Sequence, residues 1–584
     1  MNSTAMQERE ARGAAPSLAM RSKSPTQRIY DSAITEDVGD WAAHIVEKYP
    51  KSFQYAMSAR YASLTLKNKN QTANIWLRDT HAELSKASFR LAADDQELKD
   101  KATACARRCR GMSYIQAKDY CDFEGVLINK ADDDNERRYA VARAQCPRWW
   151  LRKLRKLHGQ TVEKAAIQLN LVSQKRGKYC SNEAVKMHRG QVARNTALLE
   201  MLEATNTDTG QKFSLAELSA VNVSNPLIRR AELMVRMRGF EDYAKKRNHV
   251  AMFYTVTAPS KYHASLSETG NRNPKYKDFT PRDTQSYLSK LWARIRAKLA
   301  RLGAFVYGFR VAEPHHDGTP HWHLLLFMEP VIKVTVTKIM EEYAKAEDNK
   351  ELRTANQNTA RFKPVEIDPK RGSATGYIAK YIAKNVGHVA DTGMTEDLYG
   401  NDIAEYCERV KAWSSRWGIR QFQQIGGASV TVWRELRRLD TIKNKEATQA
   451  EQIRAAADMG QWDLFTERMG GVECPRDARP VKIQKMRVTE PSMYGEPMER
   501  IVGVRWGHLP FISRLSKWVV DFAPPAKQVE VSGRASGSPW SSVNNCTGVQ
   551  QNDISTASER GTHGIRKRKR GAVATSCEAI PENN

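Results

Sequence analysis

The middle of the chain carries an ordered series of strand and helix patterns, which restricts the fold more than any other feature. The β-branched and aromatic residues of VAMFYTVT (250–257) predict a strand, since such residues pack well on a pleated surface. Thr280, Pro281 and Asp283 then provide an N-cap, a proline at the first helical position and an acid three residues after the cap. We expect the helix that they open to end at Gly303, because glycine readily adopts the left-handed C′ conformation.

Five further elements continue this series. Two strands (304–313 and 321–328) flank the turn residues Asp317 and Gly318. They are followed by a helix near 337–347, a strand near 361–367 and a helix near 374–385. Up to the last strand the order is β-α-β-β-α-β, the split βαβ or ferredoxin-like arrangement, with an antiparallel sheet and helices on one face. The final helix lies outside this order, and we expect it to pack against the sheet and face a site there.

The patterns on either side of this segment differ from it. Apolar residues recur at three- and four-residue spacing in 161–172 and 181–202, which predicts helices. Gly, Ser, Asn and Thr dominate the end of the chain, where RKRKR stands at 566–570. The expected class is α+β, and the expected regions are a disordered tail (1–35), a mainly helical region that could bind DNA (36–248), an α+β catalytic domain (249–440), a mixed region (441–524) and a disordered basic tail (525–584).

The charge of the chain indicates its partner. Lys and Arg number 93 against 66 for Asp and Glu, a net charge of +27 that favours a polyanion, most commonly nucleic acid. No apolar run approaches the roughly 20 residues of a spanning helix, and the N-terminus lacks the apolar core of a secretory signal. We therefore expect a cytoplasmic protein without a membrane partner.

Nine cysteines are scattered along the chain, and their odd number does not indicate a disulfide framework. Four of them could form a zinc site, but a C-x3-C pair without a matching second pair is a weak signal, so reduced thiols are favoured. The four are Cys105, Cys109, Cys121 and Cys146.

Two histidines stand two residues apart at the start of a predicted strand. Residues two apart in a strand point to the same face, so His321 and His323 present their imidazoles side by side, as a divalent cation requires. Trp322 points to the opposite face, towards the hydrophobic layer. For an isolated H-x-H the more common interpretation is two partly buried histidines without a catalytic role.

A third ligand is needed, because Mg²⁺ and Mn²⁺ prefer oxygen. Glu313, on the partner strand, is our candidate. A two-residue turn would pair it with Trp322, on the wrong face, whereas one bulged residue would place it opposite His321 or His323. Three residues of the turn compete for the role: His315, His316 and Asp317.

The segment GYIAKYIAKN (376–385) predicts a helix with an unusual polar face. Four residues at i, i+3, i+4 and i+7 share that face: Tyr377, Lys380, Tyr381 and Lys384. The opposite, buried stripe consists of Ile378, Ala379, Ile382, Ala383 and Val386. An ordinary amphipathic helix is the alternative, but it does not explain why the tyrosines lie on the lysine face.

The two groups of residues make chemical sense together. A tyrosine hydroxyl, with a pKa of about 10, is a poor nucleophile at neutral pH. A cation held by His321, His323 and Glu313 would polarise a scissile phosphate and stabilise the charge that develops. Lys380 or Lys384 would add positive charge or help to deprotonate a tyrosine. The predicted activity is a metal-dependent DNA endonuclease that yields a phosphotyrosine and a free 3′ hydroxyl.

These motifs resemble those of the two-tyrosine HUH endonucleases, and within them the replication gene A proteins of tailed bacteriophages and prophages. The similarity covers roughly residues 100–440. It is strongest in FYTVTAPSKYH (253–263), YGFRVAEPHHDGTPHWHLLLFM (307–328), GYIAKYIAKN (376–385) and WGIRQFQQIGGASVTVWRELRRL (417–439), and weaker in CPRWWLRKLRK (146–156) and VSNPLIRRAELMVRMRGFE (223–241).

The resemblance implies an HUH nuclease core and the initiation of rolling-circle replication in a bacterial cytoplasm. Either Tyr377 or Tyr381 then cleaves the origin strand and keeps its 5′ phosphate, while the free 3′ end primes synthesis. The second tyrosine permits a later transfer that releases a closed circle. His321 and His323 are then the metal ligands. No G-x-x-x-x-G-K-[ST] loop occurs, so we expect a host helicase as partner and no nucleotide cofactor.

Basic and aromatic residues of the segment 146–156 suit contact with single-stranded DNA: Trp149, Trp150, Arg152 and Arg155. The alternative is an amphipathic surface helix with Leu151 and Leu154 inward, and the sequence favours neither. Other functions also stay open: a conjugative relaxase or transposase with the same chemistry, a DNA-binding initiator that does not cleave, and a metal phosphoesterase that uses activated water.

Overall fold

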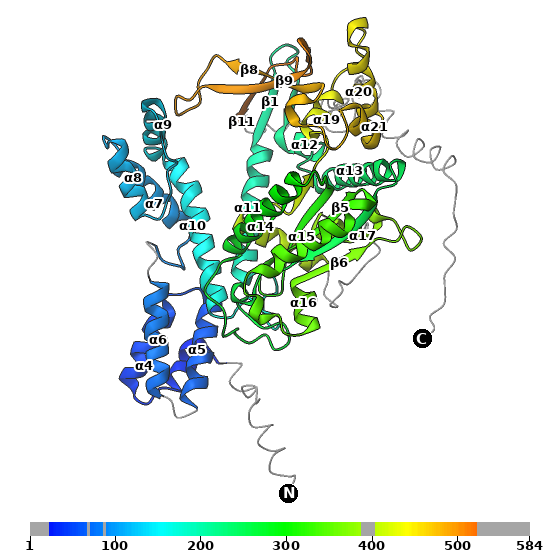
Figure 1. Ribbon diagram of the computed structural model, residues 1–584. Helices are drawn as coiled ribbons and strands as arrows, with labels where there is room; N and C mark the ends of the chain where they lie inside the picture. Colours follow the sequence, from blue (N-terminus) through cyan, green and yellow to red (C-terminus); the bar gives the residue numbers. More distant parts are fainter. Residues whose placement is uncertain (1–22, 67–69, 86–88, 387–402, 523–584) are drawn as a thin grey trace, which may run out of the picture.

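The computed structural model describes residues 23–522 apart from the segments 67–69, 86–88 and 387–402 (Figure 1). The expected basic tail at 525–584, with RKRKR at 566–570, lies outside the described residues. The class is α+β, as predicted, with a mainly helical N-terminal region and antiparallel sheets.

The N-terminal region consists of successive helices, in agreement with the spacing of its apolar residues. The helices are α3 (Pro25–Tyr30), α4 (Glu36–Glu47), α5 (Lys51–Thr65), α6 (Asn70–Leu84), α7 (Asp95–Arg108), α8 (Tyr114–Phe123), α9 (Asp134–Ala144), α10 (Pro147–Gln168) and α11 (Asn182–Met201).

The expected disordered tail at 1–35 was wrong for its last part. Residues 25–30 form α3, because Ser24 accepts a hydrogen bond from the backbone N–H of Gln27 as the N-cap and Pro25 occupies the first helical turn. Ile29 is buried in the core, which anchors the helix. Residues 1–22 lie outside the described part of the chain.

Two small sheets that the sequence did not predict contain strands from the C-terminal part. In the first, β11 (Trp518–Phe522) pairs with β1 (Leu202–Asn206), which also pairs with β2 (Lys212–Ser214). The second has the order β10-β9-β8, with β8 (Val481–Val488), β9 (Met498–Trp506) and β10 (Leu509–Ile512). The mixed region thus folds back onto the helical region (Figure 1).

The central sheet has five antiparallel strands in the order β6-β3-β5-β4-β7. The strands are β3 (Val250–Val256), β4 (Tyr307–Pro314), β5 (Pro320–Met328), β6 (Phe362–Glu366) and β7 (Phe422–Ile425). The helices between and after them are α14 (Pro281–Arg301), α15 (Lys333–Ala346), α16 (Ala355–Arg361), α17 (Ala374–Val386) and α18 (Ile403–Trp417). The predicted β-α-β-β-α-β order is confirmed, and the edge strand β7 and the short α16 are additions to it.

The limits of α14 follow the signals read from the sequence. Thr280 and Asp283 form a reciprocal capping box around Pro281. Gly303, just after the helix, has φ +64°, the left-handed conformation expected at C′.

Each face of the central sheet packs against its own set of helices. One face, with Tyr254, Trp322 and Leu324, packs against α14 and α15 in a large apolar core. The opposite face, with Phe253 and Leu325, packs against α17 and α13 (Pro226–Lys246). Three more helices join this second core, α19 (Val430–Leu436), α20 (Thr448–Asp458) and α21 (Trp462–Arg468). We call these the helical face and the site face.

The site-face core draws residues from both sides of the domain limits expected at 248 and 440. The shared core does not divide the chain at either position, so the two domain limits stay predictions. No helix in the described part of the chain is long and apolar enough to cross a membrane.

Candidate active site

The hairpin between β4 and β5 sets which residues share the site face. Glu313 pairs with His321, and Pro314 pairs with Pro320. The sequence predicts a two-residue turn corrected by a bulge, and this prediction was wrong. The loop is longer and of odd length, 315–319, so Glu313 and His321 face the same side without any bulge.

Buried polar contacts hold this loop in place. The carboxylate of Asp317 is 1% exposed and accepts hydrogen bonds from the backbone N–H groups of Ala264 (2.9 Å) and Thr319 (3.0 Å). It also lies 3.3 Å from Nδ1 of His263. Gly318 has φ +81°, and a Cβ there would lie 2.9 Å from the carbonyl oxygen of Tyr179. Asp317 thus fixes the loop and does not belong to the group of residues with metal-binding spacing, which consists of Glu313, His321 and His323.

Three side chains converge on the site face as a candidate metal centre: Glu313, His321 and His323. The Nε2 atoms of the two histidines are 2.9 Å apart, and Nε2 of His323 lies 3.5 Å from Oε2 of Glu313. One ligand atom from each residue lies within 4.8 Å of the other two. Adjacent ligands of an octahedral Mg²⁺ ion, with bonds of about 2.1 Å, lie about 3 Å apart. The donor set and its spacing therefore fit a divalent cation.

Burial favours the neutral form of two imidazoles here, one in the cluster and one beside it. It lowers the pKa of the His321 imidazole well below its usual range, and the neighbouring His315 adds to the effect. Burial, reinforced by His263, also lowers the pKa of His315 to about 3. The ring of His315 lies 4.1 Å from that of His321, measured between centroids. Neutral imidazoles offer a lone pair to a metal, whereas protonated ones repel it.

Strand β3 contributes two contacts that the sequence analysis missed. The hydroxyl of Thr255 lies 3.0 Å from Nδ1 of His323, and Thr255 is its partner in the strand register. This contact orients the ring and leaves Nε2 directed at the cluster. Phe253 stacks on His323 at 5.4 Å between centroids. Only the register of β3 against β5 could have identified these residues, and a single sequence does not show it.

Helix α17 brings the two tyrosines over the same residues. The ring of Tyr381 lies 4.5 Å from His323 and 5.5 Å from Phe253, and that of Tyr377 lies 4.7 Å from Phe253. Tyr377 is 41% exposed, whereas Tyr381 is partly buried against the site-face core. The expectation that both phenols point away from the core was therefore wrong for Tyr381, which packs between helix and sheet.

The remaining features of α17 explain its position. Ile378 and Ile382 are fully buried, as predicted for the apolar stripe. Near the start of the helix, the backbone N–H of Thr375 donates to Glu241 of α13 at 3.0 Å. The side chains of Lys380, Ala383, Lys384 and Val386 lie outside the described residues.

The four residues considered for DNA contact separate into two pairs. Trp149 and Trp150 are 4% and 0% exposed in a small core, so their rings are not available for stacking on bases. The packing interpretation holds for them because α10 turns this side inward, with the indole N–H of Trp150 donating to the carbonyl of Ala144. Arg155 forms a two-bond ion pair with Asp95, and Arg152 is exposed.

The cysteines of the described residues do not assemble a metal site. Cys105, Cys109 and Cys121 are buried in the same small core as Trp150, and Cys146 lies at its edge. Within the described part of the chain, Glu313, His321 and His323 form the only group of three or more residues with metal-binding spacing.

Comparison with known proteins shows which family the chain resembles. The family model of the bacteriophage replication gene A protein matches residues 67–388. The replication gene A protein of Escherichia phage 186 is 44% identical over 69% of this chain and 58% of the relative, so the match spans little more than half of that protein. A probable replication protein of Pseudoalteromonas phage PM2 is 35% identical over 84% of the chain and 81% of the relative.

A probable replication endonuclease from a prophage-like region of Salmonella typhi is 33% identical over 70% of the chain and 52% of the relative. No solved structure matches the chain. The family match extends across more than half of the sequence and includes the histidine pair and both tyrosines. The chain belongs to the bacteriophage replication gene A protein family.

Proposed function

We propose that this protein is a site-specific DNA endonuclease and strand transferase that initiates rolling-circle replication of a phage or prophage genome. The observation that carries the proposal is the contact between Tyr381 and His323, which places a phenol beside a candidate metal centre. The net charge of +27 and relatives named replication proteins and replication endonucleases support a DNA substrate.

Glu313, His321 and His323 bind a divalent cation, Mg²⁺ or Mn²⁺, in this proposal. When bound, the cation supplies positive charge that stabilises the transition state at the scissile phosphate. Thr255 holds His323 in the orientation that directs Nε2 to the ion. Phe253 stacks on His323 and keeps water from one side of the cluster.

The covalent step transfers a phosphodiester without consuming water. The phenolic oxygen of Tyr377 or Tyr381 forms a bond to phosphorus, and the bond from phosphorus to the 3′ oxygen breaks. The phenol loses a proton and the leaving 3′ oxygen gains one, so the overall reaction is balanced. Lys380 and Lys384 are the proposed helpers of this proton transfer. The products are a 5′-phosphotyrosine and a free 3′ hydroxyl.

A second tyrosine one turn away explains how the reaction ends. Tyr377 and Tyr381 both contact Phe253, so both phenols lie close to the same cluster. After one tyrosine has taken the 5′ end, the other attacks the regenerated origin and frees the first end for joining. The proposed partners are origin DNA and a host helicase in the bacterial cytoplasm.

The main alternative is a phosphoesterase that activates water at the same cation. It accounts for the metal cluster but gives no role to a tyrosine packed on a ligand. A relaxase or transposase would share the chemistry on different DNA, and a non-cleaving initiator would not need the cluster.

A covalent-adduct assay distinguishes these functions. The purified protein is incubated with Mg²⁺ or Mn²⁺ and supercoiled plasmid that carries the DNA around its own gene, then resolved on denaturing gels. We expect a metal-dependent protein–DNA adduct that persists in at least one of Tyr377→Phe and Tyr381→Phe and disappears in the double variant. Tyr254→Phe, on the helical face, is the matched control. Nicking without an adduct in the double variant would instead establish activated water.

A further inference from the structure

Two cavities join into one groove, and the smaller of them reaches the β4–β5 loop beside the candidate metal centre. The larger, of about 1050 Å³, lies between the segments 261–277 and 348–357. The smaller, of about 360 Å³, extends from it towards the β4–β5 loop. They share Lys275, Glu351 and Gln357 in their walls, so we treat them as continuous and call them the flanking groove.

The inner end of the flanking groove reaches the candidate active site. His263, His315 and His316 line the smaller cavity. The ring of His315 lies 4.1 Å from that of His321, one of the candidate metal ligands. A chain that occupies the groove therefore ends beside the metal cluster.

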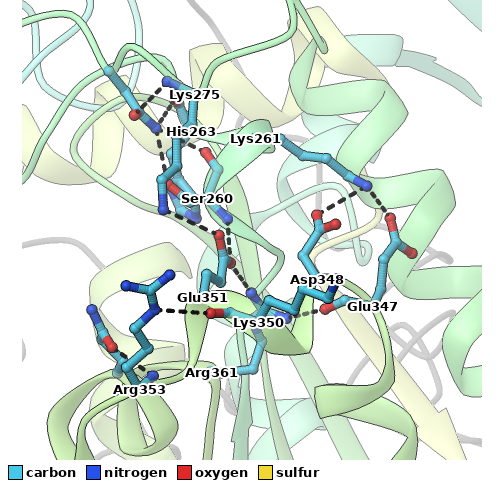
Figure 2. Close-up of polar contacts among 12 residues, drawn as sticks. Ser260, Lys261, His263, Lys275, Glu347, Asp348, Lys350, Glu351, Arg353 and Arg361 are labelled. Carbon is cyan, nitrogen blue, oxygen red and sulfur yellow. Dashed lines mark hydrogen bonds and ion pairs between the residues drawn. The ribbon is translucent and has the colours of Figure 1, made fainter.

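Buried polar contacts build the walls of this groove (Figure 2). The guanidinium of Arg361 is buried, forms an ion pair with Glu351 and donates to the carbonyl of Glu347 at 2.9 Å. Glu351 also accepts a hydrogen bond from the backbone N–H of Ser260 at 3.0 Å. Arg361 thus fastens the segment around Glu351 to the segment that carries His263.

A buried amide fixes the opposite wall. The side chain of Asn273 is 3% exposed and donates to the carbonyls of Ser260 (2.8 Å) and His263 (2.9 Å). Its oxygen accepts a hydrogen bond from the backbone N–H of Lys275 at 3.0 Å. Because both walls are held in this way, a ligand does not have to order them on binding.

The charge of the larger cavity is unevenly compensated. Lys261 is paired with Glu347 (2.5 Å) and Asp348 (3.0 Å), and Lys275 lies 3.7 Å from Glu351. Three further cations line the same cavity, and within the described residues no carboxylate lies at ion-pair distance from them. They are Lys277, Lys350 and Arg353, all exposed. The guanidinium Nε of Arg353 donates to the main-chain carbonyl of Lys350 at 3.3 Å, which ties the Arg353 side chain to the segment that carries Lys350 (Figure 2).

We propose that the flanking groove binds the phosphates of single-stranded DNA next to the scissile phosphate, through Lys277, Lys350 and Arg353. This inference rests on the proposed nuclease function and specifies how its substrate is held. Several uncompensated cations in the wall of one cavity match the repeated charge of a polynucleotide backbone. Cavities of this volume accept ligands of small-molecule size, so they suit a few nucleotides of one strand and not a duplex.

Binding of a labelled dT20 oligonucleotide in EDTA tests the groove without any cleavage. The full-length protein is compared with the triple variant Lys277→Ala/Lys350→Ala/Arg353→Ala. Each phosphate contact to a single strand contributes about 0.7 to the slope of log K against log salt. Loss of three contacts should reduce that slope by about 2 and weaken binding at 0.1 M salt by roughly 100-fold.

The matched control removes the same charge elsewhere. Lys48→Ala/Lys51→Ala/Arg60→Ala changes three exposed cations on or beside α4 and α5, and we expect dT20 binding close to that of the unaltered protein. Equal binding by both triple variants, whether weakened or not, would overturn the proposal. So would a groove variant that loses duplex DNA and retains dT20. Thermal melting of each variant checks the fold.

The adduct assay separates this inference from the proposed function. If the double tyrosine variant shows that no adduct depends on tyrosine, the nuclease proposal fails whatever the groove binds. If adducts form normally but the groove variant binds dT20 as the control does, only the groove assignment fails.

Discussion

The two faces of the central sheet are built from the same strands and have opposite character. On the helical face, Tyr254 and Trp322 are buried against α14 and α15, and their polar atoms are satisfied by Thr337 (2.8 Å) and Gln285 (2.9 Å). On the site face, the neighbouring residues Thr255 and His323 join a polar cluster under α17. Because side chains alternate between the two faces of a strand, neighbouring residues belong to an apolar layer on one face and to a polar cluster on the other.

The site face also has buried polar residues where the helical face has apolar ones, and this difference affects stability. Glu313 and His323 are buried and His321 is partly buried, and burial lowers the pKa of the His321 imidazole well below its usual range. Buried polar groups of this kind stabilise a fold less than apolar residues of similar size. We expect changes on the site face to alter metal binding and cleavage, and changes on the helical face to alter the free energy of unfolding.

The largest effect is expected from Glu313→Gln. The amide keeps the volume of the side chain but removes the negative charge that complements a divalent cation, so the rate of adduct formation should fall by about 10³-fold. Quantitative denaturing gels measure this rate, with Glu329→Gln as the control at the far end of β5. An unchanged rate in Glu313→Gln would remove this carboxylate from the cluster.

A smaller effect is expected from Thr255→Val, which removes the hydroxyl that contacts Nδ1 of His323. Loss of such an orienting contact should weaken Mn²⁺ binding by about 10- to 100-fold. Thr255→Ser keeps the hydroxyl and should bind Mn²⁺ nearly as the unaltered protein does. Equal weakening in both variants would attribute the effect to packing and contradict the orienting role.

The smallest effect on activity is expected from Trp322→Phe, on the helical face. This change removes the indole N–H that donates to Gln285 and reduces the contact with the Arg310 guanidinium, which lies 4.1 Å from the ring centroid. The free energy of unfolding should fall by about 1–2 kcal/mol in chemical denaturation. Mn²⁺ affinity should change less than about twofold, and a large loss of affinity would show that the two faces are not independent.

Much of the central fold could be predicted from local patterns. The capping box at Thr280 and the C′ glycine at position 303 mark the ends of α14 because both signals act within a few residues. The alternation of side chains along the strand around Trp322 is also a local signal, and it indicates which face of the sheet holds the histidines. The order of strands along the chain then restricts the topology.

Features that depend on distant contacts could not be predicted in this way. The length of the β4–β5 loop depends on contacts of Asp317 with Ala264 and His263, far away in the sequence. The burial of Trp149 and Trp150 depends on helices that pack around α10. The pairing of β11 with β1 joins segments more than 300 residues apart, which no local pattern indicates.

Mn²⁺ binding to the full-length protein, measured by electron paramagnetic resonance and isothermal titration, tests the candidate metal centre most directly. We expect one tightly bound ion in the unaltered protein and in His508→Ala, which changes an exposed histidine between β9 and β10. We expect His321→Ala/His323→Ala to lose this ion while its far-ultraviolet circular dichroism is retained. Undiminished binding of one Mn²⁺ ion by the double variant would contradict the assignment of the site face as the metal centre.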